Sequence, residues 1–262
     1  MVHPVGMDIY LSPRIPVPLF FSILERLLHK PNYAVSTCVD VDHFIEDQEW
    51  RSFGYSLDNV NLVKSPSKCD SSIVMANEVD FAHECTQVYV INTENPIENL
   101  HESAVHFSIK DLLMFDKNSE LSRDILSWAS DDFRKMDDRA RYWLSPRDAS
   151  DAIVSCIGLG VEQLPQHISV CGRRGWTMEQ TYSEFKSLYH RWKQGQSGQF
   201  QSEDLLITEL PIRIQPFTGS MHSRPNLQPL HSLLLNVRAD GWRPYVPLRT
   251  MLMEVIASIE KL

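Results

Sequence analysis

The sequence predicts an α/β fold with a mainly parallel sheet, helices on both faces and a smaller C-terminal lobe. Three observations support this prediction. Strand-like and amphipathic segments alternate through the first half of the chain, glycine turns and helix caps continue the alternation in the second half, and 43% of the 262 residues are hydrophobic. This hydrophobic content suffices for the core of one large or two small domains.

The first half begins with a strand, a helix and a strand. Residues 7–12 (MDIYLS) and 34–40 (AVSTCVD) are rich in strand-forming residues, and the apolar positions of 19–30 (LFFSILERLLHK) recur at helical spacing. This order is typical of a parallel βαβ unit. Further elements are expected as strands at 60–63 and 87–92 and as a helix at 119–136.

Two capping boxes mark helix starts in the second half. Ser145 is followed three residues later by Asp148, and Thr177 is followed at the same spacing by Gln180. Each pair predicts a helix that begins directly after its first member. Around these caps we expect strands at 141–144 and 167–172, helices over 149–159, after Thr177 and over 248–262, and irregular segments at 195–204 and 216–229.

Composition narrows the classes of partner. A formal charge of −9 and a sequence pI near 5.5 leave no basic surplus for nucleic acid. No apolar stretch is long enough to cross a membrane, and the first ten residues lack the basic-then-apolar order of a signal peptide, so we expect a soluble cytoplasmic protein. The five cysteines stand singly, which predicts neither a disulfide framework nor a metal site.

The pattern Y-x-x-x-K occurs twice, as Tyr182 with Lys186 and as Tyr189 with Lys193. Residues four apart share a helix face, so the spacing allows a lysine to assist a proton-transferring tyrosine. However, Met178, Tyr182, Phe185, Tyr189 and Trp192 recur at intervals of three and four, as in the apolar stripe of an amphipathic helix. We therefore interpret both tyrosines as packing residues.

Four segments occur in an order known from one enzyme family. They are DASDAIVSC (148–156), ISVCGRRGWTMEQTYSEF (168–185), RPNLQPLHSLLLN (224–236) and DGWRPYVPLRTML (240–252). Together they resemble the extended short-chain dehydrogenase/reductase family, which includes sugar-nucleotide epimerases, dehydratases and dTDP-4-dehydrorhamnose reductases. The resemblance implies a Rossmann-like domain over residues 1–175 and a smaller, dependent C-terminal lobe of the substrate-binding type over 176–262.

The first turn departs from this family. There the family carries three spaced glycines, which let backbone N–H groups approach a pyrophosphate. Here the turn reads SPRIPVP (12–18), without glycine and with three prolines that have no N–H to donate. The glycine positions fall near Arg14, Val17 and Phe20, so we expect no dinucleotide in the family's usual pose.

An active enzyme remains the alternative, with NAD or NADP bound in an altered way. Its candidate cofactor-binding residues are Ser12, Arg14, Asp40 and Asn92. The Arg14 guanidinium suits a phosphate, and Asp40 matches the acidic residue that holds a ribose hydroxyl in the family. A third alternative is that the altered turn binds a different small molecule.

No catalytic residue is assigned by the resemblance. The family places its catalytic Y-x-x-x-K before the helix at 148–156, but no such pattern lies between Asn92 and Asp148. Tyr10, Tyr89 and Tyr142 lie near expected strand ends without a lysine partner. The main hypothesis is therefore a divergent relative that has lost dehydrogenase chemistry and acts as a binding, regulatory or assembly subunit. Its partner would be a protein, a second copy or a nucleotide-sugar-like molecule, and the loop 216–229 is one candidate contact.

Overall fold

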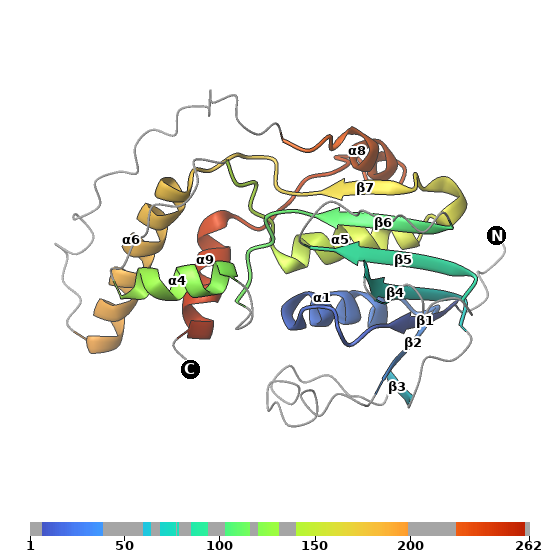
Figure 1. Ribbon diagram of the computed structural model, residues 1–262, viewed down its shortest axis with the longest axis horizontal. Helices are drawn as coiled ribbons and strands as arrows, with labels where there is room; N and C mark the ends of the chain where they lie inside the picture. Colours follow the sequence, from blue (N-terminus) through green and yellow to red (C-terminus); the bar gives the residue numbers. More distant parts are fainter. Residues whose placement is uncertain are drawn as a thin grey trace. The chain divides into compact units, whose positions relative to one another are not determined.

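The computed structural model describes residues 7–38, 60–63, 69–76, 78, 85–93, 103–115, 120–130, 140–198 and 224–259 (Figure 1). The elements are β1 (Met7–Leu11), α1 (Val17–Leu28), β2 (Tyr33–Cys38), β3 (Val60–Val63), β4 (Ser71–Met75), β5 (Gln87–Asn92), β6 (Ala104–Ile109), α4 (Glu120–Ala129), α5 (Pro146–Ile157), η3 (Val161–Gln163), β7 (His167–Val170), α6 (Met178–Ser197), α8 (Gln228–Leu235) and α9 (Leu248–Ile259). Among the described residues, α1 separates β1 from β2 and α4 and α5 precede β7, whereas β2 to β6 follow one another without a described helix, so the predicted alternation is found only in part.

The strands form one parallel sheet in the order β3-β2-β1-β4-β5-β6-β7. Each neighbouring pair is parallel, from β2 with β3 at one edge to β6 with β7 at the other. The chain builds outward from β1 in one direction and then, from β4 on, in the other. This topology is Rossmann-like and confirms the predicted α/β class.

The unit of β1, α1 and β2 confirms the predicted strand, helix and strand. Helix α1 begins at Val17, two residues before the predicted start, and five apolar side chains spaced along one face are buried in the core. These are Leu19, Phe20, Ile23, Leu24 and Leu27. Burial of this stripe against the sheet, rather than a side-chain cap, holds the helix in place, because Pro16 at the N-cap position makes no capping hydrogen bond.

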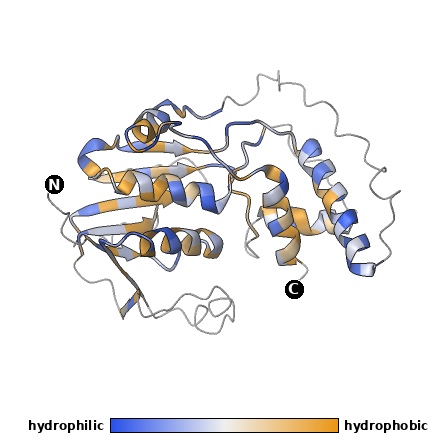
Figure 2. Ribbon diagram, turned by 180° about the vertical axis from the view of Figure 1, so that it is seen from behind, coloured by the Kyte–Doolittle hydropathy of each residue, from blue (hydrophilic) through white to orange (hydrophobic). Residues whose placement is uncertain are grey.

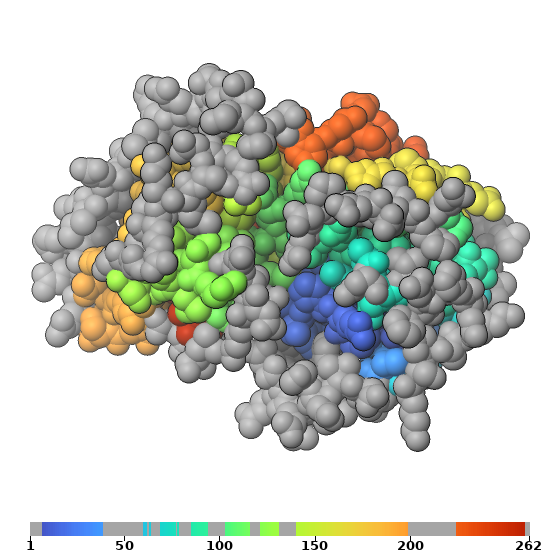
Figure 3. All heavy atoms as spheres, viewed as in Figure 1, coloured from blue at the N-terminus to red at the C-terminus, as the bar shows by residue number. Residues whose placement is uncertain are grey.

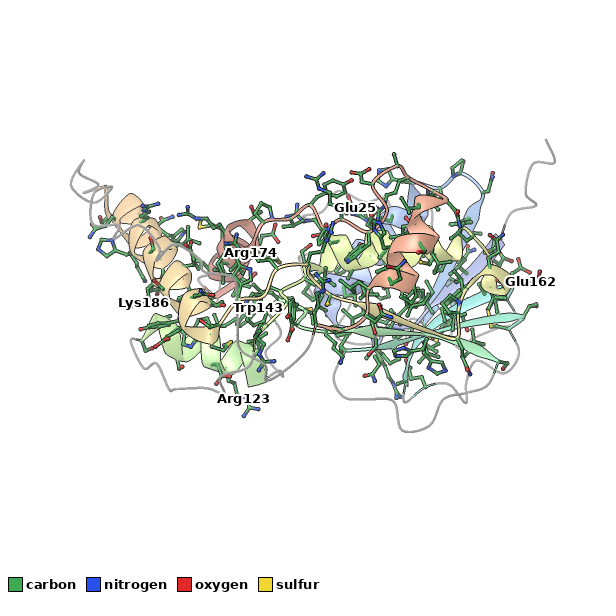
Figure 4. The ribbon with its side chains drawn as sticks, turned by 90° about the horizontal axis from the view of Figure 1, so that it is seen from above. Glu25, Arg123, Trp143, Glu162, Arg174 and Lys186 are labelled. Atoms are coloured by element: carbon green, nitrogen blue, oxygen red, sulfur yellow. A yellow bond between two sulfur atoms is a disulfide. The ribbon has the colours of Figure 1, made fainter. Side chains whose placement is uncertain are left out.

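Helices cover one face of the sheet, which Figure 2 views directly. Asp151 of α5 lies 3.8 Å from Nε of Arg26 in α1 and also pairs with Arg238, just after α8, so α1, α5 and α8 share this face (Figure 4). Tyr10 and Val90 belong to a cluster on the opposite face and are also buried. Both faces of the sheet are therefore shielded from water, as is usual for parallel sheets.

The structure differs from the sequence predictions at several elements. The expected strand at 141–144 is wrong, because Arg141 bridges antiparallel to Trp176 whereas Leu144 bridges parallel to Leu112, and no continuous ladder forms. Strands β4 and β6 and helix α8 were not predicted. The loop expected at 195–204 begins later, since α6 runs to Ser197. Residues 119 and 131–136 of the predicted helix at 119–136, and residues 216–223 of the predicted irregular segment at 216–229, lie outside the described residues.

Both predicted capping boxes cap helices. The Thr177 side chain accepts from the backbone N–H of Gln180 at 3.1 Å, and the Gln180 side chain accepts from the N–H of Thr177 at 3.0 Å. At the second helix, the N–H of Asp148 donates to Oγ of Ser145 at 3.0 Å, and this hydroxyl donates to the Asp148 carboxylate at 2.9 Å, so Ser145 caps the helix but the bonds differ from the reciprocal pair of a capping box. Helices α6 and α5 begin directly after Thr177 and Ser145, as predicted.

The chain divides into two compact units, each built from separate stretches. The first, with the sheet, comprises 1–109, 149–170 and 227–242; the second comprises 110–148, 171–226 and 243–262. A lobe that starts at residue 176 remains a prediction. No helix of the described residues is long and apolar enough to span a membrane.

The second unit has its own core between α4, α6 and α9, and the surface of α4 adjoins that of α6 (Figure 3). Tyr182 and Tyr189 are partly buried against this core, where they meet Trp128 and Phe185 at centroid distances of 5.7 and 5.5 Å. The Lys193 ammonium lies 5.2 Å from the centre of the Tyr189 ring. The interpretation of both tyrosines as packing residues is confirmed.

Candidate binding site where the strand order reverses

The most promising site in the sheet unit lies at the carboxyl ends of β1 and β4. The strand order reverses between these two strands, and open parallel sheets bind ligands at such a point, in the crevice outside the carboxyl ends. The residues here are 12–16 after β1, Met75 at the end of β4, and Ala76 and Glu78 after it. Their side chains decide what the crevice accepts.

A carboxylate, that of Glu78, lies at the centre of this site. Its Oε2 accepts a hydrogen bond from Oγ of Ser12 at 2.5 Å and another from the backbone N–H of Met75 at 3.2 Å. Its Oε1 lies 3.4 Å from Nε of Arg14. The N–H of Arg14 in turn donates to Oγ of Ser12 at 3.2 Å. Two hydrogen bonds and one ion pair thus hold the Glu78 carboxylate at the site.

Burial makes this arrangement a fixed part of the fold. Ser12 is fully buried and Glu78 is 7% exposed, whereas the Arg14 side chain is 61% exposed. A buried carboxylate is strongly unfavourable unless hydrogen bonds and an opposite charge replace its water. Ser12 and Met75 supply the buried donors, and Arg14 supplies the charge at the surface.

A tyrosine lies beside the carboxylate. Burial raises the pKa of Tyr10, and a hydrogen bond with the Cys38 side chain and the charge of Glu78 raise it further, while Arg14 opposes them. Tyr10 therefore stays a neutral phenol at physiological pH. Cys38, at the end of β2, is partly exposed and is not in a disulfide.

The other two candidate tyrosines lie elsewhere. Tyr89 is fully buried, and its hydroxyl donates to Oε1 of Gln87 at 2.9 Å. Burial also raises its pKa. Tyr142 belongs to the second unit, where its backbone N–H donates to Oδ2 of Asp111 at 2.7 Å. Of the three, only Tyr10 has its side chain at the site.

The predicted cofactor-binding residues are only partly brought together. Ser12 and Arg14 lie side by side at the site. Asn92 ends β5, the strand beyond β4, and Asp40 lies outside the described residues. Sequence reasoning missed Glu78, because it is recognisable as a site residue only once β4 is known to end just before it.

The N-terminus of α1 offers few backbone donors. Pro16 and Pro18 have no N–H, and the N–H groups of Leu19 and Phe20 both bond to the Pro16 carbonyl at 2.9 Å. Val17 is 42% exposed, whereas Phe20 is fully buried in the core. An anion at this helix end would find little of the usual ring of N–H groups. Among the described residues, no group of three His, Cys, Asp or Glu is placed to hold a metal ion.

The fold class is shared with NAD(P)-dependent enzymes of known structure. UDP-glucuronic acid 4-epimerase from Bacillus cereus, solved with NAD, matches at a TM-score of 0.60 and 11% identity over 98% of this chain and 97% of its own. Yeast methylglyoxal/isovaleraldehyde reductase with NADPH matches at 0.59 and 10% over 97% and 98%. The terminal R domain from the myxalamid biosynthetic pathway matches at 0.59 and 11% over 98% and 91%.

At these identities the likeness shows the fold alone. No protein-family model and no curated protein sequence matches the chain.

Proposed function

We propose that the protein is a binding, regulatory or assembly subunit that keeps a dehydrogenase-like fold without its hydride-transfer chemistry. The observation that carries the proposal is the Glu78 carboxylate, bound by Ser12, Met75 and Arg14 at the reversal of strand order. In the related fold this crevice takes the pyrophosphate of a dinucleotide. Here the protein supplies its own anion.

The Glu78 carboxylate and a bound phosphate would repel each other, because both carry negative charge. Two like charges 4 Å apart repel by about 1 kcal/mol in water and by about 4 kcal/mol at an effective dielectric constant of about 20. Glu78 would therefore repel each phosphate of a dinucleotide. The Arg14 guanidinium would offset this repulsion little, because it is already paired with Glu78. The prolines at positions 16 and 18 remove further donors. A dinucleotide in the usual pose therefore has little to bind to.

A second observation concerns catalysis. In the family that the sequence resembles, the catalytic tyrosine and lysine come before the helix that corresponds to residues 148–156. Here β5 ends at Asn92 and β6 begins at Ala104, so only residues 93–103 make the crossover. Parallel crossovers usually take a dozen or more residues, so this connection is short for its kind, and its sequence contains no Y-x-x-x-K.

The alternative is an NAD(P)-dependent epimerase, dehydratase or reductase that acts on a nucleotide sugar. Two structural neighbours, the epimerase and the yeast reductase, were solved with NAD and NADPH. The Tyr10 hydroxyl lies at the site, and the exposed Arg14 could turn from Glu78 toward a phosphate. This alternative requires Glu78 to move or to take up a proton.

Calorimetry with NAD, NADP and a UDP-sugar at millimolar concentration tests the proposal. We expect no binding by the wild type. Glu78→Gln isolates the charge, and we expect it to bind no tighter than millimolar, because the prolines still lack N–H groups. Glu162→Gln is the matched control, since Glu162 projects outward from η3 (Figure 4). A micromolar dissociation constant for the wild type, about 8 kcal/mol of binding free energy, would overturn the proposal.

A further inference from the structure

In the described part of the sheet unit, Cys69 and Cys85 form a disulfide. The sequence did not predict it, because the pairing depends on the register of the sheet. Ser71 of β4 lies opposite Gln87 of β5, so the residues two positions before each strand also meet. Their Cα atoms are 5.1 Å apart, within the range that a disulfide spans.

This disulfide closes the stretch of chain that carries the site carboxylate. Between Cys69 and Cys85 run β4 and then Glu78, so the cross-link lies at the amino ends of the strands and Glu78 lies at their carboxyl ends. Closing a loop restricts the conformations that its residues can adopt. Local opening that releases Glu78 from Ser12 and Arg14 therefore gains less chain entropy while the disulfide is intact.

The two sulfur atoms differ in access. Cys69 is 8% exposed, whereas Cys85 is partly exposed. An incoming thiolate therefore reaches Cys85 first and makes Cys69 the leaving group. Sγ of Cys69 lies 3.2 Å from the carbonyl oxygen of Ser71, which can accept the S–H that reduction creates. The site is thus arranged for exchange in a defined order.

We propose that the Cys69–Cys85 disulfide is a thiol-exchange site that sets how firmly Glu78 closes the binding site. A thiolate of the reductant attacks Sγ of Cys85, the S–S bond breaks, and Cys69 leaves and takes up a proton. A second thiol attacks the mixed disulfide and releases Cys85 as a thiol. Two thiols of the reductant are oxidised to one disulfide as the protein disulfide gains two electrons and two protons.

The proposal rests on the proposed function, because it regulates the same site. In the cytoplasm, where the sequence predicts the protein to reside, disulfides are usually transient and redox-sensing. The other buried cysteines do not compete in this exchange. Burial raises the pKa of both Cys156 and Cys171 to about 12, so neither forms much thiolate at physiological pH.

Hydrogen–deuterium exchange on the full chain, before and after dithiothreitol, tests the proposal. We expect reduction to speed exchange by about tenfold in residues 12–15 and 75–78 and to leave α9 unchanged. The double variant Cys69→Ala/Cys85→Ala should exchange like the reduced protein and should not respond to dithiothreitol. If the variant does not fold, the reduced wild type provides the same comparison.

Three results would overturn the proposal. They are unchanged exchange at residues 75–78 after reduction, a change confined to the residues beside the two sulfurs, and mass spectra showing both cysteines as free thiols in untreated protein. Titration of the oxidised protein with NAD separates this proposal from the proposed function. Micromolar binding there would end the binding-subunit proposal, whereas the exchange data would still decide whether the disulfide controls the Glu78 segment.

Discussion

Removing the Ser12 hydroxyl should weaken the fold more than removing the Arg14 side chain. Ser12→Ala deletes the shortest bond to Glu78 and leaves Oε2 with only the Met75 N–H in a buried position. A buried charged group that loses a hydrogen bond costs about 1 to 3 kcal/mol. Arg14→Ala deletes an ion pair whose arginine is 61% exposed, and such pairs contribute about 0 to 1 kcal/mol.

Thermal unfolding of the two variants beside the wild type measures this difference. At about 2 to 4 °C per kcal/mol, Ser12→Ala should lower Tm by about 2 to 12 °C and Arg14→Ala by less than about 4 °C. Added salt should reduce only the Arg14 effect, because salt screens exposed pairs more than buried bonds. If Arg14→Ala proves as costly as Ser12→Ala, the ion pair holds the site and our account of the buried hydrogen bonds is wrong.

Three further predictions concern the rest of the chain. Gly172→Ala should lower Tm markedly, because an added Cβ would overlap a backbone carbonyl oxygen, whereas Gly195→Ala in α6 meets nothing within 4 Å and should raise stability by about 0.5 to 1 kcal/mol. Cys156 and Cys171 should resist iodoacetamide near neutral pH until the protein is denatured, as read by peptide mass spectrometry, because burial raises both pKa values to about 12. Partial burial raises the pKa of Glu254 although the charge and hydrogen bond of Arg147 oppose it, so the contribution of this group to the free energy of unfolding should fall as pH rises through that pKa. In denaturant titrations from about pH 4 to about pH 7, the wild type should lose stability relative to Glu254→Gln.

Helices whose apolar residues lie on one face could be predicted from the sequence. Helix α1 shows a clear apolar stripe, and α6 has both a stripe and a capping box, so their type and position follow from local signals. Strands β4 and β6 lack such a signal. Nearly every residue in them is buried, so their sequences do not alternate between apolar and polar residues. The polar residues Ser71, Ser72 and His106 also interrupt the apolar run by which a central strand is recognised.

Only the part of the candidate site that follows β1 could be predicted from the sequence. The turn after β1 stood out because prolines and Arg14 replace the glycines of the family that the sequence resembles. Its partner Glu78 and the Cys69–Cys85 disulfide depend on the neighbouring positions of β1, β4 and β5 in the sheet. The local sequence does not show which strands become neighbours in the sheet. Glu78 and the disulfide could therefore be found only in the structure.

The division of the chain into interleaved units has a consequence for how the protein is made. The sheet unit draws on residues 149–170 and 227–242 as well as on the first 109, and α8 from the last of these stretches packs on β7. During synthesis the ribosome therefore releases most of the second unit before the first has all its parts. Domains encoded one after another can fold in turn as they emerge. Here each unit includes a stretch from residues 227–262, so neither has all its residues until that late part of the chain has been made.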